Sequence, residues 1–167
     1  MSTMSTMTAL AWSPELTLNH PQMDHTHEEF VELLGAAATA LPGPEPELLA
    51  AFETLVAHTV EHFGQEDRWM AATGFAPENC HAFQHQAVLQ VMQECAKRAR
   101  EGSDFEPLRL AVDELAVWFP QHAQMMDAAL AQHLDSLGFD PATGQCREGA
   151  LATAEAGVIG CGGSSCG

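Results

Sequence analysis

Seven residues of metal-binding type recur at helical spacing, and each lies among apolar residues. They are five histidines and two carboxylates: His27, His62, Glu66, His81, His85, His122 and Asp127. Imidazole and carboxylate groups are suitable ligands for iron, zinc and related cations. A buried imidazole or carboxylate without a partner is costly, and a pair of cations would give all seven a common partner. The sequence therefore predicts a dinuclear metal site.

Two pairs among these residues have the spacing of one helix face. His62 and Glu66 lie four residues apart, and so do His81 and His85, which could chelate one ion together. A single pair of this kind often arises by chance. Ligand-type residues on four separate segments are hard to attribute to chance, so the combination favours a metal site.

Four segments with helical hydrophobic periodicity carry these residues. The predicted helices span 24–41, 46–72, 77–100 and 104–137. Asp24 is the predicted N-cap of the first segment, and Gly74 and Gly102 are predicted to end the second and third. Strand signals are nearly absent. The sequence therefore predicts an all-α fold, an antiparallel up-down-up-down four-helix bundle.

The regions outside the bundle have a different composition. The bundle is predicted over residues 21–138, with residues 1–20 as an N-terminal arm. Residues 139–167 are rich in Gly and Cys, contain no capped periodic segment, and are predicted to form a flexible, disordered C-terminal tail.

The apolar pattern of the last segment slips by one residue between His122 and Asp127. A step of five residues rotates a side chain by about 140° in a regular helix. A π-bulge absorbs one extra residue, and such bulges are frequent at functional sites. Pro120 removes a backbone donor nearby. We therefore predict a π-bulge between His122 and Asp127.

The remaining histidines are predicted to lie outside the ligand set. His25 is in phase with Glu28 and Glu29 and should face water, whereas His27 is in phase with Phe30 and should face inward. The predicted surface histidines are His20, His25 and His133. His58, one turn from His62, is predicted to lie beside the site or at the surface.

Composition excludes several classes of partner. The chain has 23 acidic and 6 basic residues, which argues against nucleic acid and anionic membranes. It contains neither a signal-peptide pattern nor a membrane-spanning apolar stretch, so we expect a cytoplasmic protein. The odd number of cysteines does not suggest a disulfide framework. The thiols of Cys146, Cys161 and Cys166 could bind metal or form a disulfide, but incidental thiols in a flexible tail are favoured.

Taken in order, the four groups resemble the bacterial hemerythrin family. The matching motifs are Asp24-x-x-His27, His62-Phe63-x-x-Glu66-Asp67-x-x-Met70, His81-x-x-x-His85 and Trp118-x-x-x-His122-x-x-x-x-Asp127. The resemblance extends over about Trp12 to Leu134. It implies a non-heme di-iron protein that binds dioxygen reversibly, as an oxygen carrier, store or supplier and not as an enzyme.

The resemblance also implies a role for each ligand. His81, His85 and His122 would hold one saturated iron. His27 and His62 would hold the other iron and leave a position open for dioxygen. Glu66 and Asp127 would bridge the two ions together with an oxo or hydroxo group.

An apolar pocket around the open position would exclude water and protons. Its predicted lining is Phe30, Phe63, Trp118 and Phe119. The family commonly has leucine three residues before the last histidine, where this chain has Phe119, and Pro120 is also atypical. The larger ring of Phe119 is expected to narrow the pocket or to change the access of the ligand.

Other functions use similar ligands. An oxygen or redox sensor, an iron-handling protein and a di-iron oxidase or peroxidase are the alternatives at the same site. Carboxylate-rich oxidase sites use paired Glu-x-x-His motifs, and only Glu78-x-x-His81 fits that pattern here. A dinuclear hydrolase would need a general base in a solvated cleft, and no such group lies on the predicted inward faces.

Overall fold

The computed structural model describes residues 9–75 and 80–147. Its helices are α1 (Pro21–Ala40), α2 (Glu45–Ala72), α3 (Cys80–Gly102), α4 (Glu106–His122) and α5 (Ala128–Ser136), with the 3-10 helix η1 (Pro14–Leu16) in the arm and the π-helix η2 (Ala123–Asp127) between α4 and α5. These residues contain no β-strand beyond one isolated bridge. The protein is therefore all-α, as predicted, and α4, η2 and α5 together form the fourth helix of a bundle.

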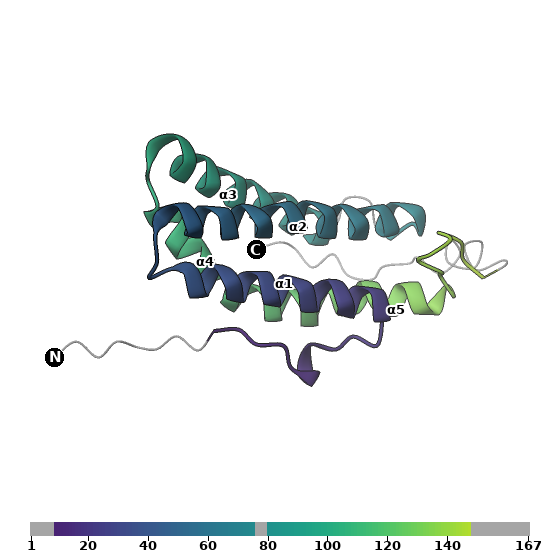
Figure 1. Ribbon diagram of the computed structural model, residues 1–167. Helices are drawn as coiled ribbons and strands as arrows, with labels where there is room; N and C mark the ends of the chain where they lie inside the picture. Colours follow the sequence, from purple (N-terminus) through teal and green to yellow (C-terminus); the bar gives the residue numbers. More distant parts are fainter. Residues whose placement is uncertain (1–8, 76–79, 148–167) are drawn as a thin grey trace.

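Consecutive helices of the bundle run in opposite directions (Figure 1). Contacts between helix ends agree with this arrangement. Arg100, late in α3, pairs with Glu53, early in α2, at 2.6 Å. Arg109, early in α4, donates a hydrogen bond to the carbonyl of Leu41, which follows α1. Each helix therefore packs beside the one before it, and α4 returns to α1.

Apolar side chains fill the bundle on both sides of one polar level. The larger cluster includes Phe30, Leu34, Leu48, Phe52, Leu55, Met92, Leu108 and Phe119. The smaller cluster is formed by Met23, Trp69, Met70, Leu130, Ala131 and Leu134. Burying each large apolar side chain contributes about 1.5–3 kcal/mol. The free energy gained by burying these two clusters can therefore offset the cost of burying several polar side chains in the layer between them.

Helix α1 begins three residues before its predicted start. Pro21 occupies the first turn, and His20 Nδ1 accepts a hydrogen bond from the Met23 amide at 3.1 Å. The prediction of Asp24 as N-cap was therefore wrong. Asp24 lies in the first turn, where a carboxylate is also favourable, and its Oδ1 accepts the Leu18 amide at 2.7 Å, which fastens the arm to α1.

The ends of α2 and α3 are set by residues with positive φ. Gly74 has φ 66°, and the Phe75 amide bonds the Met70 carbonyl at 2.9 Å, which ends α2 near the predicted position. Helix α3 continues through Gly102, and Ser103 adopts φ 53° in place of a glycine. The predicted start of the third helix at residue 77 lies outside the described residues.

After α5 the chain folds back on itself. Gly138 has φ 58°, Asp140 pairs with Gln145 in the isolated bridge, and the Arg147 amide bonds the Leu137 carbonyl at 2.9 Å. Residues 139–147 of the predicted tail therefore form a closed turn, because they find backbone partners at the end of α5. Residues 148–167 lie outside the described residues. None of the described helices combines the length and apolar character needed to cross a membrane.

Candidate metal centre

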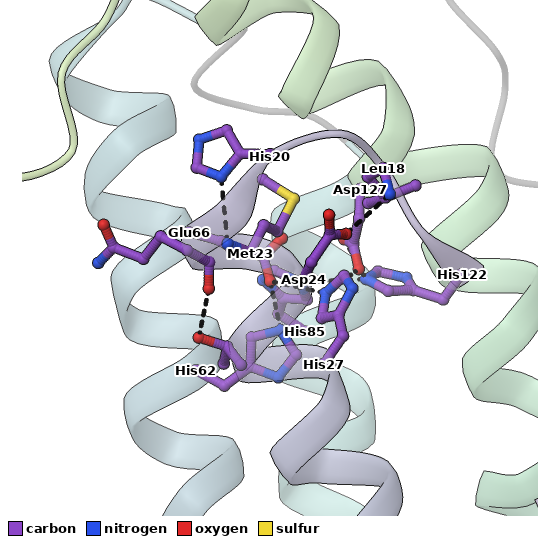
Figure 2. A network of polar contacts seen from close by, with 12 residues as sticks. Leu18, His20, Met23, Asp24, His27, His62, Glu66, His85, His122 and Asp127 are labelled. Carbon is purple, nitrogen blue, oxygen red and sulfur yellow. Dashed lines mark hydrogen bonds and ion pairs between the residues drawn. The ribbon is translucent and has the colours of Figure 1, made fainter. Parts of the chain in front are cut away.

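The structure brings the seven predicted ligand residues together at one level of the bundle. They come from α1 (His27), α2 (His62, Glu66), α3 (His81, His85), the end of α4 (His122) and η2 (Asp127), and all are buried. Figure 2 shows side chains from different helices turned toward the space between them. The polar level is thus built from all four helices of the bundle.

The predicted π-bulge is confirmed, and it positions Asp127. The amide of Ala128 bonds the carbonyl of Ala123, five residues earlier, at the end of η2. The extra residue in this turn corrects the phase slip after His122. Asp127 is fully buried as a result and faces the histidines of three other segments.

The ligand atoms form two groups that share Asp127. One group is made of His81, His85, His122 and Asp127, and the other of His27, His62, Glu66 and Asp127. Within each group the candidate ligand atoms lie within 4.8 Å of one another. The arrangement therefore offers three imidazoles to one position and two imidazoles to a second.

Each carboxylate reaches both groups. Asp127 Oδ1 lies 2.8 Å from His81 Nε2 and 3.0 Å from His122 Nε2, whereas its Oδ2 lies 3.0 Å from His27 Nε2. Glu66 Oε2 lies 2.6 Å from His62 Nε2, and its Oε1 lies 3.6 Å from His81 Nε2. Both carboxylates are therefore placed to bridge two cations.

Most of these buried polar atoms have no hydrogen-bond partner within the described chain. The unpartnered atoms are both ring nitrogens of His27, His62 and His81 and both carboxylate oxygens of Glu66 and Asp127. Several of the histidine nitrogens lie within about 3 Å of a carboxylate oxygen, but the side chains are not oriented so that the two atoms form a hydrogen bond. Each unsatisfied buried group costs about 1–3 kcal/mol, and charged groups cost more. Cations at the two positions would remove this cost, so the donor set fits a dinuclear metal centre.

His85 and His122 give a second test of the fit. The Nδ1–H of His85 donates to Asp67 Oδ1 at 2.8 Å, and that of His122 donates to Gln84 Oε1 at 3.1 Å. Their Nε2 lone pairs then face each other at 3.2 Å. Two nitrogens each about 2.1 Å from one ion and at right angles would be about 3.0 Å apart. The observed separation matches two neighbouring ligands of one cation.

The sequence patterns gave no role to Asp67 or Gln84, although Asp67 lies within one of the matching motifs. Each orients a ligand histidine through its Nδ1–H, a role that fixes the tautomer and raises the basicity of the ring. A usable signal was present, because Asp67 directly follows Glu66 and Gln84 directly precedes His85. A hydrogen-bond acceptor that is adjacent in sequence to a ligand residue lies at the side of its helix. From there it can reach a ligand histidine on the neighbouring helix.

The imidazoles and carboxylates shift one another's protonation. Burial raises the pKa of Asp127, but the neighbouring imidazoles outweigh burial and hold that pKa well below its usual value; the pKa of Glu66 is also lowered. Burial lowers the pKa of His81, but Asp127 and Glu66 outweigh it and raise the pKa to about 9. The same balance raises the pKa of His27. A metal ion binding here must therefore displace protons from imidazoles.

The four predicted pocket residues pack against the imidazoles of the two groups. Phe30 and Phe119 stack at 4.6 Å, and Phe119 meets the ring of His27 edge-on at 5.2 Å. Phe63 lies parallel to His85 at 4.1 Å, and Trp118 stacks on His122 at 4.4 Å. Phe30 and Phe119 therefore adjoin the two-imidazole group, and Trp118 stacks on an imidazole of the other group. Phe63 adjoins both groups, because its ring also lies 5.2 Å from the ring of His62.

The other histidines differ in their surroundings. The His25 side chain is 74% exposed and lies 3.3 Å from Glu29, so it faces water as predicted. His58 belongs to neither ligand group. His20 and His133 are partly exposed, and each makes a hydrogen bond that the sequence did not predict. His20 caps α1, and His133 Nε2 donates to the Thr73 carbonyl at 3.2 Å.

Comparison with known proteins agrees with this geometry. Residues 20–134 match the family described as Hemerythrin HHE cation binding domain. The chain is 37% identical over 134 residues to bacteriohemerythrin of Ralstonia nicotianae, across 80% of this chain and 95% of that protein. It is 27% identical over 99 residues to the bacteriohemerythrins of Pseudomonas paraeruginosa and Pseudomonas aeruginosa, across 59% of this chain and 65% of each relative. No solved structure gives a significant match. This chain belongs to the hemerythrin family.

Proposed function

We propose that this chain is a non-heme di-iron protein that binds dioxygen reversibly and acts as an oxygen carrier, store or local supplier. The five buried imidazoles and two bridging carboxylates form a donor set that suits iron. Membership of a family described as cation-binding supports a metal centre.

The unequal division of the imidazoles is the observation that carries the proposal. Three imidazoles adjoin one position and two adjoin the other, while both carboxylates reach both positions. The second position therefore has one protein ligand fewer, so a cation held there would keep a coordination position open for a small ligand. When bound, the iron pair would supply the electrons and the open coordination position that dioxygen needs.

The surrounding side chains favour binding over turnover. Phe30 and Phe119 are almost fully buried beside His27 and keep water from this side of the centre. The ligand set has only two carboxylates, whereas the di-iron sites of the ferritin-like proteins are rich in carboxylates. We therefore propose that the activity is reversible ligand binding and that the chain is not an enzyme.

A single preparation tests this proposal. The protein is loaded with Fe²⁺ without oxygen, analysed for metal, then exposed to oxygen and degassed while absorption spectra are recorded. We expect two irons per chain and an absorption band that appears with oxygen and disappears on degassing. Stoichiometric zinc in the protein as isolated, or irreversible oxidation on first exposure, would refute reversible oxygen binding.

Two histidine variants provide a matched comparison. His81→Ala removes a ligand that is 2.8 Å from Asp127, and we expect it to lose metal. His25→Ala removes an exposed imidazole of α1, and we expect it to keep two irons and the reversible band. Equal metal content in the two variants would contradict the assignment of the ligands.

A further inference from the structure

A row of ligand-type side chains leads from the surface to the two-imidazole group. His25 Nε2 lies 3.3 Å from Glu29 Oε1 on α1. The other oxygen of Glu29, Oε2, lies 3.9 Å from His58 Nε2 on α2. The ring of His58 lies 6.0 Å from the ring of His62, a residue of the proposed centre. None of His25, Glu29 and His58 belongs to either ligand group.

The exposure of these side chains falls steadily along the row. It is 74% for His25, 46% for Glu29, 15% for His58 and 2% for His62. His58 Nδ1 is buried and has no hydrogen-bond partner in the described chain. A cation leaving water at His25 would therefore meet a new oxygen or nitrogen donor at each stage of its desolvation.

His58 and His62 have a geometry that suits a shared ion. They lie four residues apart on α2, the spacing that also relates His81 and His85. If each nitrogen lies about 2.1 Å from an ion, and each ring centre about 1.2 Å beyond its nitrogen, two imidazoles sharing that ion have ring centres at most about 6.6 Å apart. The observed 6.0 Å falls within this limit.

We propose that His25, Glu29 and His58 form a loading route by which a divalent cation reaches the dinuclear centre. The cation exchanges one protein donor for the next, from His25 and Glu29 to His58, then to the His58–His62 pair, and finally to Glu66. No electron is transferred in this passage, and the donors exchange as neutral imidazoles and carboxylates. The route rests on the proposed function, because it delivers metal to that centre.

The test compares rates of metal uptake with final metal content. Metal-free full-length protein is mixed with Fe²⁺ without oxygen, and uptake is followed for the parent chain, Glu29→Gln and His58→Gln. The carboxylate of Glu29 attracts cations, and electrostatic focusing of this kind raises association rates by about tenfold or more, so we expect Glu29→Gln to load about tenfold more slowly. His58→Gln removes the nitrogen donor between Glu29 and His62, so we expect it to load more slowly as well. The final content should remain two irons per chain, because neither residue belongs to the centre.

Release of the metal to a chelator distinguishes a route from a binding site. A route acts in both directions, so release should slow by the same factor and the affinity should not change. Glu28→Gln is the matched control, because it removes the same charge from an exposed position of α1 beside the row. We expect this control to load and release at the parent rates.

Several outcomes would overturn the route. Parent-like loading in both Glu29→Gln and His58→Gln would do so, and so would an equal slowing in Glu28→Gln, which would indicate only a general charge effect. A weaker affinity with an unchanged loading rate would show that these residues retain metal and do not deliver it. Failure of the proposed function has a different signature, since the parent chain itself would then not take up two irons, or would take them up and be oxidised irreversibly on exposure to oxygen.

Discussion

Replacing Asp67 by alanine removes the acceptor that holds the Nδ1–H of His85. The hydrogen bond is 2.8 Å long and links α2 to a ligand histidine on α3. Without it, the ring of His85 loses its fixed tautomer, and its Nε2 becomes a weaker donor. We therefore expect Asp67→Ala to bind metal less tightly at the three-imidazole position, with little effect on the position formed by His27 and His62.

The size of this effect follows from the partner and its exposure. Loss of a residue that orients a metal ligand typically weakens metal binding by about 10–100-fold. The Asp67 side chain is 45% exposed, so solvent screens its charge, and we expect the lower end of that range. About tenfold corresponds to about 1.4 kcal/mol.

Competition with a chelator without oxygen measures the affinity directly. Asp67→Asn keeps an oxygen acceptor at the same place and should lie between the parent and Asp67→Ala. The affinity should fall in that order, while the unfolding of the metal-free proteins remains similar. Parent-like affinity in Asp67→Ala would refute the reasoning, because the ring of His85 would then be held by its stacking on Phe63 alone.

Three further results are expected. The pKa of His81 is raised from 6.5 to about 9 in the folded, metal-free protein. The protonated imidazole therefore stabilises that fold fully below pH 6.5, and this stabilisation is lost as the pH rises through 9. Denaturant unfolding of the metal-free protein should show that the free energy of unfolding falls by an amount on the order of 3 kcal/mol between these pH values. His81→Gln should make the free energy of unfolding depend less on pH. Phe119→Leu opens space between Phe30 and His27, so we expect the oxygenated absorption band to decay faster in air than in the parent. Gly35 lies inside α1 with nothing within 4 Å of an added Cβ, so Gly35→Ala should raise the free energy of unfolding by about 0.5–1 kcal/mol, and an unchanged denaturation midpoint would contradict this.

The helices and their inward faces could be predicted because apolar and ligand-type residues recur in the sequence with the helical period. Apolar residues recur every three or four positions in each segment, and the ligand residues occupy the same faces. The choice of His27 over His25 followed from phase alone, and the structure gives one buried and one exposed side chain. Periodicity therefore decided which histidines lie in the bundle and which face water.

Contacts between segments that are distant in sequence were not predictable in the same way. The pairing of Asp67 with His85 and of Gln84 with His122 depends on how helices are rotated against one another. Asp24 illustrates a local failure. An aspartate before an apolar helix is a typical N-cap, but Pro21 and His20 start α1 earlier, and the carboxylate binds the arm at Leu18.

The π-helix explains how a site with an odd spacing can be built on a regular bundle. One of the two bridging carboxylates faces the histidines of α1 and α3 at close range: Asp127 has one oxygen 3.0 Å from His27 and the other 2.8 Å from His81. In a regular helix the fifth residue after His122 would turn away by about 140°. Pro120 cannot donate to the helix ladder, and one turn later the chain adopts five-residue hydrogen bonding. The local loss of α-helical bonds thus places the carboxylate between the two groups of imidazoles, and the apolar residues Leu130 and Leu134 of α5 return to the core in phase with it.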